Sequence, residues 1–152
     1  NMTNHSYFNL DGEGSGNVLE QYLTIHGEKF TPVGEGSIPL GENISVEGTP
    51  MDFRKEKKIG RDIEADFEQL KITGGYDHNY ALTDCPCVQF YAGNFVENEK
   101  GKNGHIYQPR DGFCLETQVE PDAVHVEAFH SPVLEKGKKY YSETIYRFSV
   151  KE

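Results

Sequence analysis

The sequence has 152 residues, of which 36% are hydrophobic and 26% are charged, and its formal net charge at pH 7 is −10. A chain of this length buries a core of its own, and the excess of acidic groups argues against nucleic acid and anionic membrane surfaces as partners. No apolar run approaches the roughly 18 residues that a membrane-spanning helix needs. We therefore expect a globular domain that binds neither nucleic acid nor membrane.

The cysteines and the start of the chain indicate a cytoplasmic protein. No basic segment followed by an apolar one marks a secretion signal, and the three cysteines are too few and odd in number for a disulfide framework. The "CPC" string of Cys85 and Cys87 lacks the CxxC spacing of zinc and redox sites, so we interpret it as two incidental thiols at a turn. Because the first residue is Asn1 rather than Met, we expect further residues upstream.

The chain opens with "NMTNHSYFNL", an extended segment whose two faces differ. Side chains alternate between the faces of an extended chain. One face is therefore a row of hydrogen-bonding groups, namely Thr3, His5, Tyr7 and Asn9. The other is mostly apolar and consists of Met2, Ser6, Phe8 and Leu10. The pattern is typical of a segment that packs on a core and presents His5 to a polar, ring-shaped ligand.

Short runs rich in β-branched and aromatic residues follow, separated by glycine and proline, which indicates an all-β protein. The expected strands are Leu19–His26, Tyr76–Leu82, Val88–Phe95, Phe113–Val119, Val124–Phe129 and Tyr140–Val150. One helix is expected over residues 56–71, ending at Thr73–Gly75, because Ile59, Ile63, Phe67 and Leu70 form one apolar stripe. Long loops are expected over Thr31–Pro50 and Glu97–Arg110. We predict an antiparallel β-sandwich with one short helix, its function lying on loops and one sheet face.

Three polar side chains stand out as candidates for chemistry. They are His5, Asp77 in "GGYDHNYAL" and Glu116 in "GFCLETQVEPD". A carboxylate in the middle of a strand, beside a half-buried cysteine, is less usual than one in a loop. Each also has an ordinary explanation, as a structural histidine, a turn aspartate or a solvated glutamate. From spacing alone the pattern indicates only a β-sandwich with a polar groove.

Five strings, taken together, carry a more specific signal: "TNHSYFNL", "GTPMDFR", "GGYDHNY", "VQFYAGNF" and "GFCLETQVEPD", in that order. In this combination the sequence resembles the aldose 1-epimerases, or galactose mutarotases, from Asn1 to about Phe148. The resemblance implies an antiparallel β-sandwich that interconverts the α and β anomers of hexoses such as galactose and glucose. It implies no cofactor and no metal.

The resemblance also implies roles for single residues. It implies that Glu116 of "LETQ" is the general base and that His5 of "TNHSYFNL" is the general acid. It implies that Asp77 hydrogen-bonds sugar hydroxyls and that Gln89 lines the sugar site. Opening the sugar ring requires a base at the anomeric hydroxyl and an acid at the ring oxygen, each with a pKa not far from the working pH. We expect His5 and Glu116 to flank a gap as wide as a pyranose ring, without a direct hydrogen bond.

Two departures from the family pattern stand out. The family's upstream strands are absent, so residues 1–152 resemble the C-terminal part of a family member and form a single partial domain. Between "GGYDHNYALTD" and "CVQFYAGNF" only Cys85 and Pro86 remain. The family has further strands there, and roughly two strands, or about 20 residues, are missing near residues 84–87.

Three other functions compete with a hexose mutarotase. A non-catalytic carbohydrate-binding fragment would keep Asp77, Gln89 and the aromatic residues. An epimerase of phosphorylated hexoses would need basic side chains, and no arginine lies in a matched catalytic motif. A histidine-based metal site is not expected, because the six histidines form no HxH or HxxxH pair.

Overall fold

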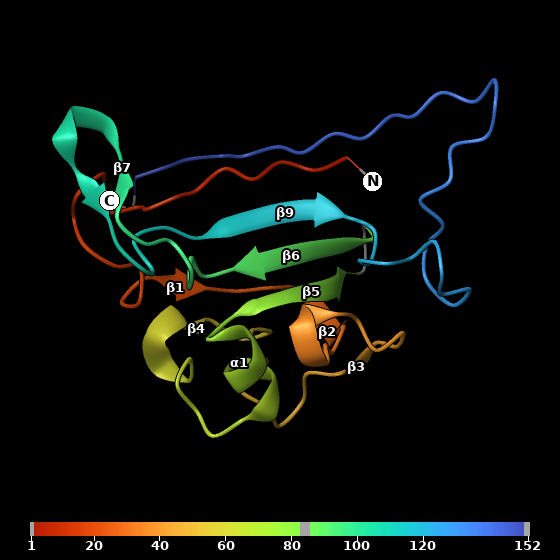
Figure 1. Ribbon diagram of the computed structural model, residues 1–152, viewed down its shortest axis with the longest axis horizontal. Coiled ribbons are helices and arrows are strands. Elements are labelled where there is room, and N and C mark those ends of the chain that lie inside the picture. Colours follow the sequence, from red (N-terminus) through yellow and green to blue (C-terminus); the bar gives the residue numbers. More distant parts are fainter. Residues whose placement is uncertain (1, 83–85, 151–152) are drawn as a thin grey trace.

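The computed structural model describes residues 2–82 and 86–150, and its centre is a five-stranded antiparallel sheet with the strand order β3-β2-β5-β6-β9 (Figure 1). These strands are β2 (Gly27–Phe30), β3 (Ile44–Ser45), β5 (Asp77–Leu82), β6 (Cys87–Tyr91) and β9 (Cys114–Gln118). The most extensive pairings are β5 with β6 and β6 with β9, each with five residue pairs in register. The register of these three adjacent strands therefore fixes which of their side chains share a face of the sheet.

The remaining elements are short. Strand β1 (Tyr22–Leu23) pairs with β4 (Lys57–Lys58), and β7 (Glu99–Lys100) pairs with β8 (Ile106–Tyr107). Single 3₁₀ turns are η1 (Glu35–Ser37), η2 (Ile59–Arg61) and η3 (Lys102–Gly104), and the α-helix is α1 (Glu68–Thr73). The predictions of an all-β antiparallel fold and of one short helix are confirmed.

The hydrophobic core lies between the sheet and a second layer built from the β1–β4 ribbon, α1 and the loops beside them. From the sheet, Tyr80 and Phe90 are fully buried in it. From the second layer, Phe53 packs against Tyr76 and Phe90 with ring centroids 4.9 and 5.6 Å apart. These aromatic pairs bury large apolar areas. The sheet therefore has one dry face, which leaves the other for polar chemistry.

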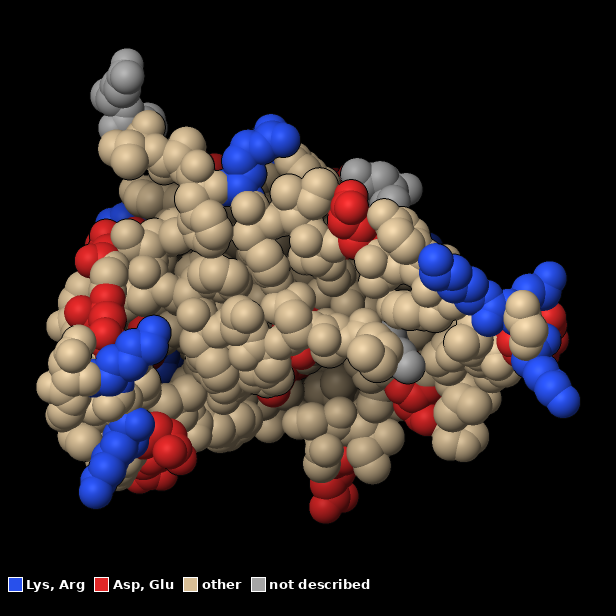
Figure 2. Space-filling model, turned by 90° about the horizontal axis from the view of Figure 1, so that it is seen from above, with Lys and Arg blue, Asp and Glu red and all other residues tan. Residues whose placement is uncertain are grey.

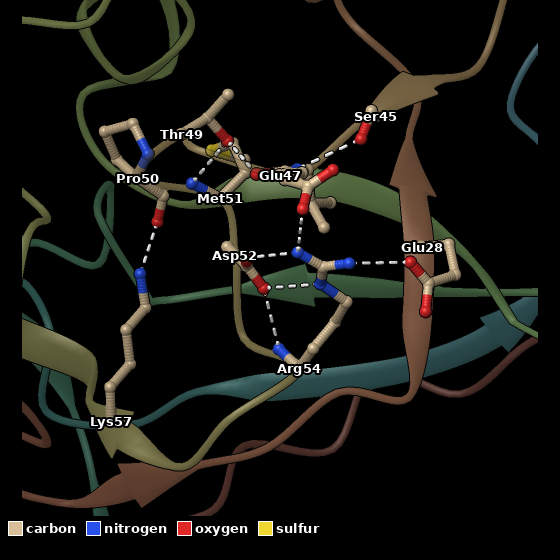
Figure 3. Close-up of polar contacts among 10 residues, drawn as sticks. Glu28, Ser45, Glu47, Thr49, Pro50, Met51, Asp52, Arg54 and Lys57 are labelled. Carbon is tan, nitrogen blue, oxygen red and sulfur yellow. Dashed lines mark hydrogen bonds and ion pairs between the residues drawn. The ribbon is translucent and has the colours of Figure 1, made fainter.

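The loop before β4 is held to the sheet by charged side chains (Figure 3). The Arg54 guanidinium donates to Asp52 Oδ2 at 2.7 Å and to Oε2 of Glu28, which lies on β2, at 2.8 Å. Lys57 is buried and donates to the Pro50 carbonyl and to Asp62 Oδ2. Burial lowers the pKa of Lys57, although its contact with Asp62 opposes this shift. Arg54 and Lys57 therefore form hydrogen bonds within the second layer and between it and β2.

The predicted helix over residues 56–71 is too long, because α1 covers only Glu68–Thr73. The apolar stripe is buried as expected at Ile59 and Leu70, but Ile59 lies in η2. Gly60 causes the difference, because its N–H binds the Leu19 carbonyl at 2.8 Å and its Cα lies against that residue. The predicted stop is confirmed, since Gly74 ends α1 in the left-handed conformation.

The strand predictions divide into two groups. Strands β5, β6 and β9 lie where expected, although β6 ends at Tyr91, and the first expected strand contributes only β1. The expected strand over 124–129 is wrong, because this stretch is a series of turns closed by local hydrogen bonds. The expected strand over 140–150 is wrong as well. Residues 140–150 run extended beside the N-terminal segment (Figure 1). Their hydrogen bonds to β9 come from side chains, and Tyr146 Oη, for example, donates to the Leu115 carbonyl at 3.1 Å.

Gly74→Ala tests the end of α1. Gly74 has φ +66°, a conformation that a Cβ disfavours. We expect the substitution to lower the free energy of unfolding by about 1 kcal/mol in urea titration. Gly74→Asn is the control, because asparagine tolerates this conformation, and it should lower stability less. Equal stability of the alanine variant and the wild-type protein would contradict this assignment.

Candidate active site

The face of the sheet opposite the core carries a polar row. In the β5–β6–β9 register, Asn79 lies opposite Gln89, and Gln89 lies opposite Glu116. In the next row, Asp77 lies opposite Tyr91 and Tyr91 opposite Cys114. Because neighbouring strands lie about 5 Å apart, residues distant in the sequence form one compact patch.

The N-terminal segment adds His5 to this patch. Phe8 and Phe113 exchange two backbone hydrogen bonds of 2.8 and 3.0 Å, which place residues 2–8 beside β9. His5 then lies over β9, with Nδ1 3.4 Å from Cys114 Sγ and Nε2 3.4 Å from Glu116 Oε1. The His5 side chain remains 56% exposed, whereas that of Glu116 is 10% exposed.

His5 and the polar row of the sheet line a cavity of about 460 Å³, and Cys114 is buried beside it. The structure brings together all four residues predicted from the sequence, His5, Asp77, Gln89 and Glu116. Tyr7, which the sequence places on the same face as His5, also lines the cavity. The lining residues outside the predicted set are Thr31, Val33, Ser37, Pro39, Asn79, Tyr91, Gln118 and Pro121. The alternation of side chains along β5 and β6 was the signal for Asn79 and Tyr91, since they share a face with Asp77 and Gln89.

The expected gap between the acid and the base is wrong. His5 Nε2 and Glu116 Oε1 are 3.4 Å apart, an ion-pair distance. The reason is that the Phe8–Phe113 bridge makes the N-terminal segment the immediate neighbour of β9, and long side chains on adjacent strands reach each other. For a pyranose to lie between the two groups, the half-exposed His5 imidazole has to turn away from Glu116.

Burial shifts the proton affinities of the cavity wall. Desolvation raises the pKa of Glu116, which the nearby His5 lowers and Asp77 raises further. Desolvation also raises the pKa of Asp77, and the hydrogen bond from Gln89 opposes that shift. The pKa of the Cys114 thiol rises to about 12, first through burial and then through the two carboxylates. A carboxylate made more basic in this way is suited to accept a proton near neutral pH.

Two amide oxygens in the cavity wall have no hydrogen-bond partner among the described residues. Gln89 Nε2 donates to Asp77 Oδ1 at 2.7 Å, and Gln89 Oε1 is buried without a hydrogen bond. Asn79 Nδ2 donates to Thr31 Oγ1 at 2.9 Å, and Asn79 Oδ1 is likewise buried and unpaired. A buried polar atom without a partner costs free energy. A side-chain movement that opens these oxygens to the cavity lets the hydroxyl donors of a ligand remove that cost.

A chain of hydrogen bonds links Asn79 to the loop that follows β9. Thr31 Oγ1, which accepts from Asn79, donates to Asn43 Oδ1 at 2.7 Å. Asn43 Nδ2 donates to Glu120 Oε1 at 3.1 Å, and the Glu120 carboxylate also accepts the His130 N–H at 3.1 Å. The amide of Asn79 is therefore oriented by the loop that follows β9.

The described residues that line the cavity include no lysine or arginine. Arg54 is bound to Asp52 and Glu28, and Arg110 pairs with Glu64 at 3.0 Å. Figure 2 shows one face of the molecule, with its basic side chains toward the edge and a largely uncharged middle. The cavity consequently has acceptors for hydroxyl groups but no cation for a phosphate.

Comparison with known proteins places the chain in a family. The family model for aldose 1-epimerase matches residues 1–84 and 81–147. The chain belongs to the aldose 1-epimerase family. The resemblance seen in the sequence motifs is therefore confirmed.

Its relatives include enzymes of animals and bacteria. The chain is 40% identical to galactose mutarotase of Pongo abelii over 175 residues, covering 99% of this chain and 50% of the relative. It is 35% identical to aldose 1-epimerase of Escherichia coli, covering 97% of the chain and 50% of that enzyme. The chain thus spans about half the length of the curated relatives it matches.

Solved structures agree with this assignment. A GalM/aldose epimerase homologue from C. elegans matches 91% of the chain with a TM-score of 0.78 and 26% identity, and the match covers 47% of that protein. Galactose 1-epimerase from Lactobacillus acidophilus matches 76% of the chain with a TM-score of 0.65 and 30% identity, covering 39% of that enzyme. The β-sandwich fold predicted from the sequence is that of this family.

The predicted internal gap near residues 84–87 remains a prediction. The two family matches meet at residues 81–84, next to the proposed junction. Residues 83–85, including Cys85 of the "CPC" string, lie outside the described part of the chain. Within the described part, no helix is both long and apolar enough to cross a membrane.

The raised pKa of Glu116 makes a prediction about stability. The folded protein holds this proton more tightly than the unfolded chain, so the free energy of unfolding falls as pH rises from about 4 through the folded pKa. Glu116→Gln removes this loss, because its amide does not ionise. The variant should be more stable than the wild-type protein at pH 7, and its advantage should shrink toward pH 4.

Thermal unfolding at both pH values measures this difference. Glu127→Gln, at an exposed position outside the cavity, is the control and should change stability little at either pH. A Glu116→Gln protein that is less stable than the wild type at pH 7 would show that the carboxylate stabilises the fold.

Proposed function

We propose that the chain acts as an aldose 1-epimerase, binding a neutral hexose such as galactose or glucose and interconverting its α and β anomers. The observation that carries this proposal is the His5–Glu116 pair, which lies in a cavity beside two unpaired buried amide oxygens. The His5 imidazole supplies the acid that ring opening requires, and the Glu116 carboxylate, whose pKa is raised, supplies the base. Family membership and the names of the relatives support the same reaction.

The proposed reaction begins when the sugar separates His5 from Glu116. Glu116 takes the proton of the anomeric hydroxyl, the bond between the anomeric carbon and the ring oxygen breaks, and His5 gives a proton to the ring oxygen. The product is the open-chain aldehyde. Rotation about its first carbon–carbon bond turns the other carbonyl face toward the hydroxyl. The ring then closes as His5 takes back its proton and Glu116 returns its own, so both residues regain their starting states.

The other polar side chains hold the sugar. The Asp77 carboxylate and the Gln89 and Asn79 amide oxygens accept hydrogen bonds from hydroxyl groups. Tyr7 and Tyr91 flank His5, with ring centroids 5.2 and 6.0 Å from the imidazole, and offer apolar surface to the C–H faces of a pyranose. We assign no cofactor to this reaction, because proton transfers alone complete it.

The charge of the cavity favours a neutral hexose over a phosphorylated one. Its wall combines two carboxylates with acceptor oxygens, and the described lining residues carry no lysine or arginine. Phosphate recognition uses such cations. A cytoplasmic location belongs to the same proposal, and the buried Cys114 thiol outside any disulfide is consistent with it.

Glu116→Gln tests the base. Glutamine keeps the size and hydrogen-bonding ability of the side chain but does not take a proton at neutral pH. The turnover rate for galactose, followed by polarimetry, should fall by roughly 10²–10⁴-fold, and sugar affinity should change much less. Asp77→Asn should have the opposite bias, with weaker binding and a smaller effect on turnover. A Glu116→Gln protein with most of its turnover would remove Glu116 from its assigned role.

Asn79→Ala tests the unpaired acceptor. The substitution removes Asn79 Oδ1 from the cavity wall, so the sugar loses one hydrogen bond worth roughly 0.5–1.5 kcal/mol. We expect KM for galactose to rise by about 2- to 10-fold with a small change in kcat. Unfolding curves identify any loss of folded protein through the lost contact with Thr31. An unchanged KM in a fully folded variant would show that Asn79 does not contact the sugar.

A further inference from the structure

Two side chains of the cavity lining, His5 and Glu116, and the buried Cys114 beside them form a set of metal ligands that the sequence did not reveal. His5, Cys114 and Glu116 each offer one ligand atom, and these atoms lie within 4.8 Å of one another. The expectation that no metal binds rested on the family resemblance and on the spacing of the histidines. That test does not detect a set with one nitrogen, one sulfur and one oxygen from distant parts of the chain.

The distances fit a small tetrahedral ion. Zinc binds cysteine sulfur at about 2.3 Å and histidine nitrogen at about 2.0–2.1 Å, which places the two ligand atoms about 3.5 Å apart at a tetrahedral angle. His5 Nδ1 and Cys114 Sγ are 3.4 Å apart. Glu116 follows two residues after Cys114 on β9 and projects from the same face. Its Oε1 lies 3.4 Å from the other ring nitrogen, His5 Nε2, so the Glu116 carboxylate has to rotate toward Nδ1 to bind the same ion.

The donor set selects the kind of metal. Sulfur and imidazole favour zinc and similar thiophilic divalent ions, whereas magnesium and calcium prefer oxygen ligands alone. The surroundings favour a cation, because Asp77 also lines the cavity and the described lining residues include no lysine or arginine. The half-exposed His5 gives the ion a path from solvent.

We propose that His5, Cys114 and Glu116 form an inhibitory binding site for Zn²⁺ in the active-site cavity. Binding replaces the thiol proton of Cys114, which is released to solvent, with a zinc–sulfur bond. The ion occupies a lone pair of the His5 imidazole and an oxygen of Glu116. The fourth position faces the cavity and takes water. The proposal of a metal site depends only on the three ligands. The proposal of inhibition rests on the proposed function, since the ion binds both the acid and the base.

Cobalt provides a test of the site that does not depend on activity. Co²⁺ replaces Zn²⁺ in such sites, and its bond to a thiolate gives a charge-transfer absorption in the near ultraviolet. We expect the purified chain to bind one equivalent of Co²⁺ with this absorption, and Zn²⁺ to abolish it by displacement. Cys114→Ala should lack the absorption, and the Cys85→Ser/Cys87→Ser double variant should retain it.

Several outcomes overturn the site. They are the absence of the absorption from the wild-type chain, its persistence in Cys114→Ala, and its loss in a folded Cys85→Ser/Cys87→Ser variant. Circular dichroism of each variant separates loss of the site from loss of the fold. Weak binding by histidine–carboxylate pairs elsewhere, such as His125 with Asp122, does not produce a thiolate band.

Mutarotation then tests the inhibition. Zn²⁺ should slow galactose mutarotation by the wild-type chain, chelator should restore it, and high galactose should weaken the effect. Removal of a group that only supports a metal ligand costs about 10–100-fold in metal affinity, and removal of a ligand should cost at least as much. The Cys114→Ala variant should therefore need at least roughly tenfold more Zn²⁺ than the wild-type chain to lose the same fraction of its activity. Full activity at saturating Zn²⁺ would overturn the inhibitory role. A chain that binds Co²⁺ through Cys114 but catalyses no mutarotation would contradict the proposed function and leave the metal site standing.

Discussion

Two backbone hydrogen bonds between Phe8 and Phe113 hold the candidate site together. They place the N-terminal segment next to β9, and without them His5 has no fixed position relative to Glu116. Phe8 also packs against Phe113, Tyr146 and Phe148, with ring centroids 6.3, 5.0 and 5.9 Å away. The proposed acid, His5, thus lies in a segment outside the named strands, whereas the proposed base, Glu116, lies on β9. The His5 side chain is accordingly 56% exposed, whereas that of Glu116 is 10% exposed.

The sheet separates two tasks by the alternation of its side chains. Tyr80 and Phe90 build the core on one face, and Asp77 and Gln89 face the cavity on the other. The polar face is not arranged for stability. Two carboxylates have pKa values raised by burial, and two amide oxygens are unpaired. Unsatisfied groups of this kind cluster at functional sites, because a ligand completes them.

Much of this arrangement follows from the sequence, and the failures have physical reasons. Alternation along the opening segment, 77–82 and 114–118 assigned the correct face to His5, Asp77 and Glu116. The motif strings brought in Gln89, which has no distinctive spacing. Strand β2 was missed, because "GEKF" is short and half polar and gains its place by pairing with β3 and β5. The helix was overextended, because Gly60 binds Leu19 instead of continuing a helical turn. The contact of His5 with Cys114 depends on pairing between distant segments, which no local pattern encodes.

The central claim is that His5 and Glu116 transfer protons to and from a sugar in this cavity, rather than only holding it. Exchange spectroscopy of the anomeric protons of galactose measures this directly, because it records the rate of interconversion at equilibrium. We expect the exchange rate between the α and β signals to rise in proportion to the concentration of the chain, at pH 7 and without added metal or cofactor. Binding of galactose, seen as shifts of protein resonances, without any acceleration of anomeric exchange would contradict the claim and identify a carbohydrate-binding fragment.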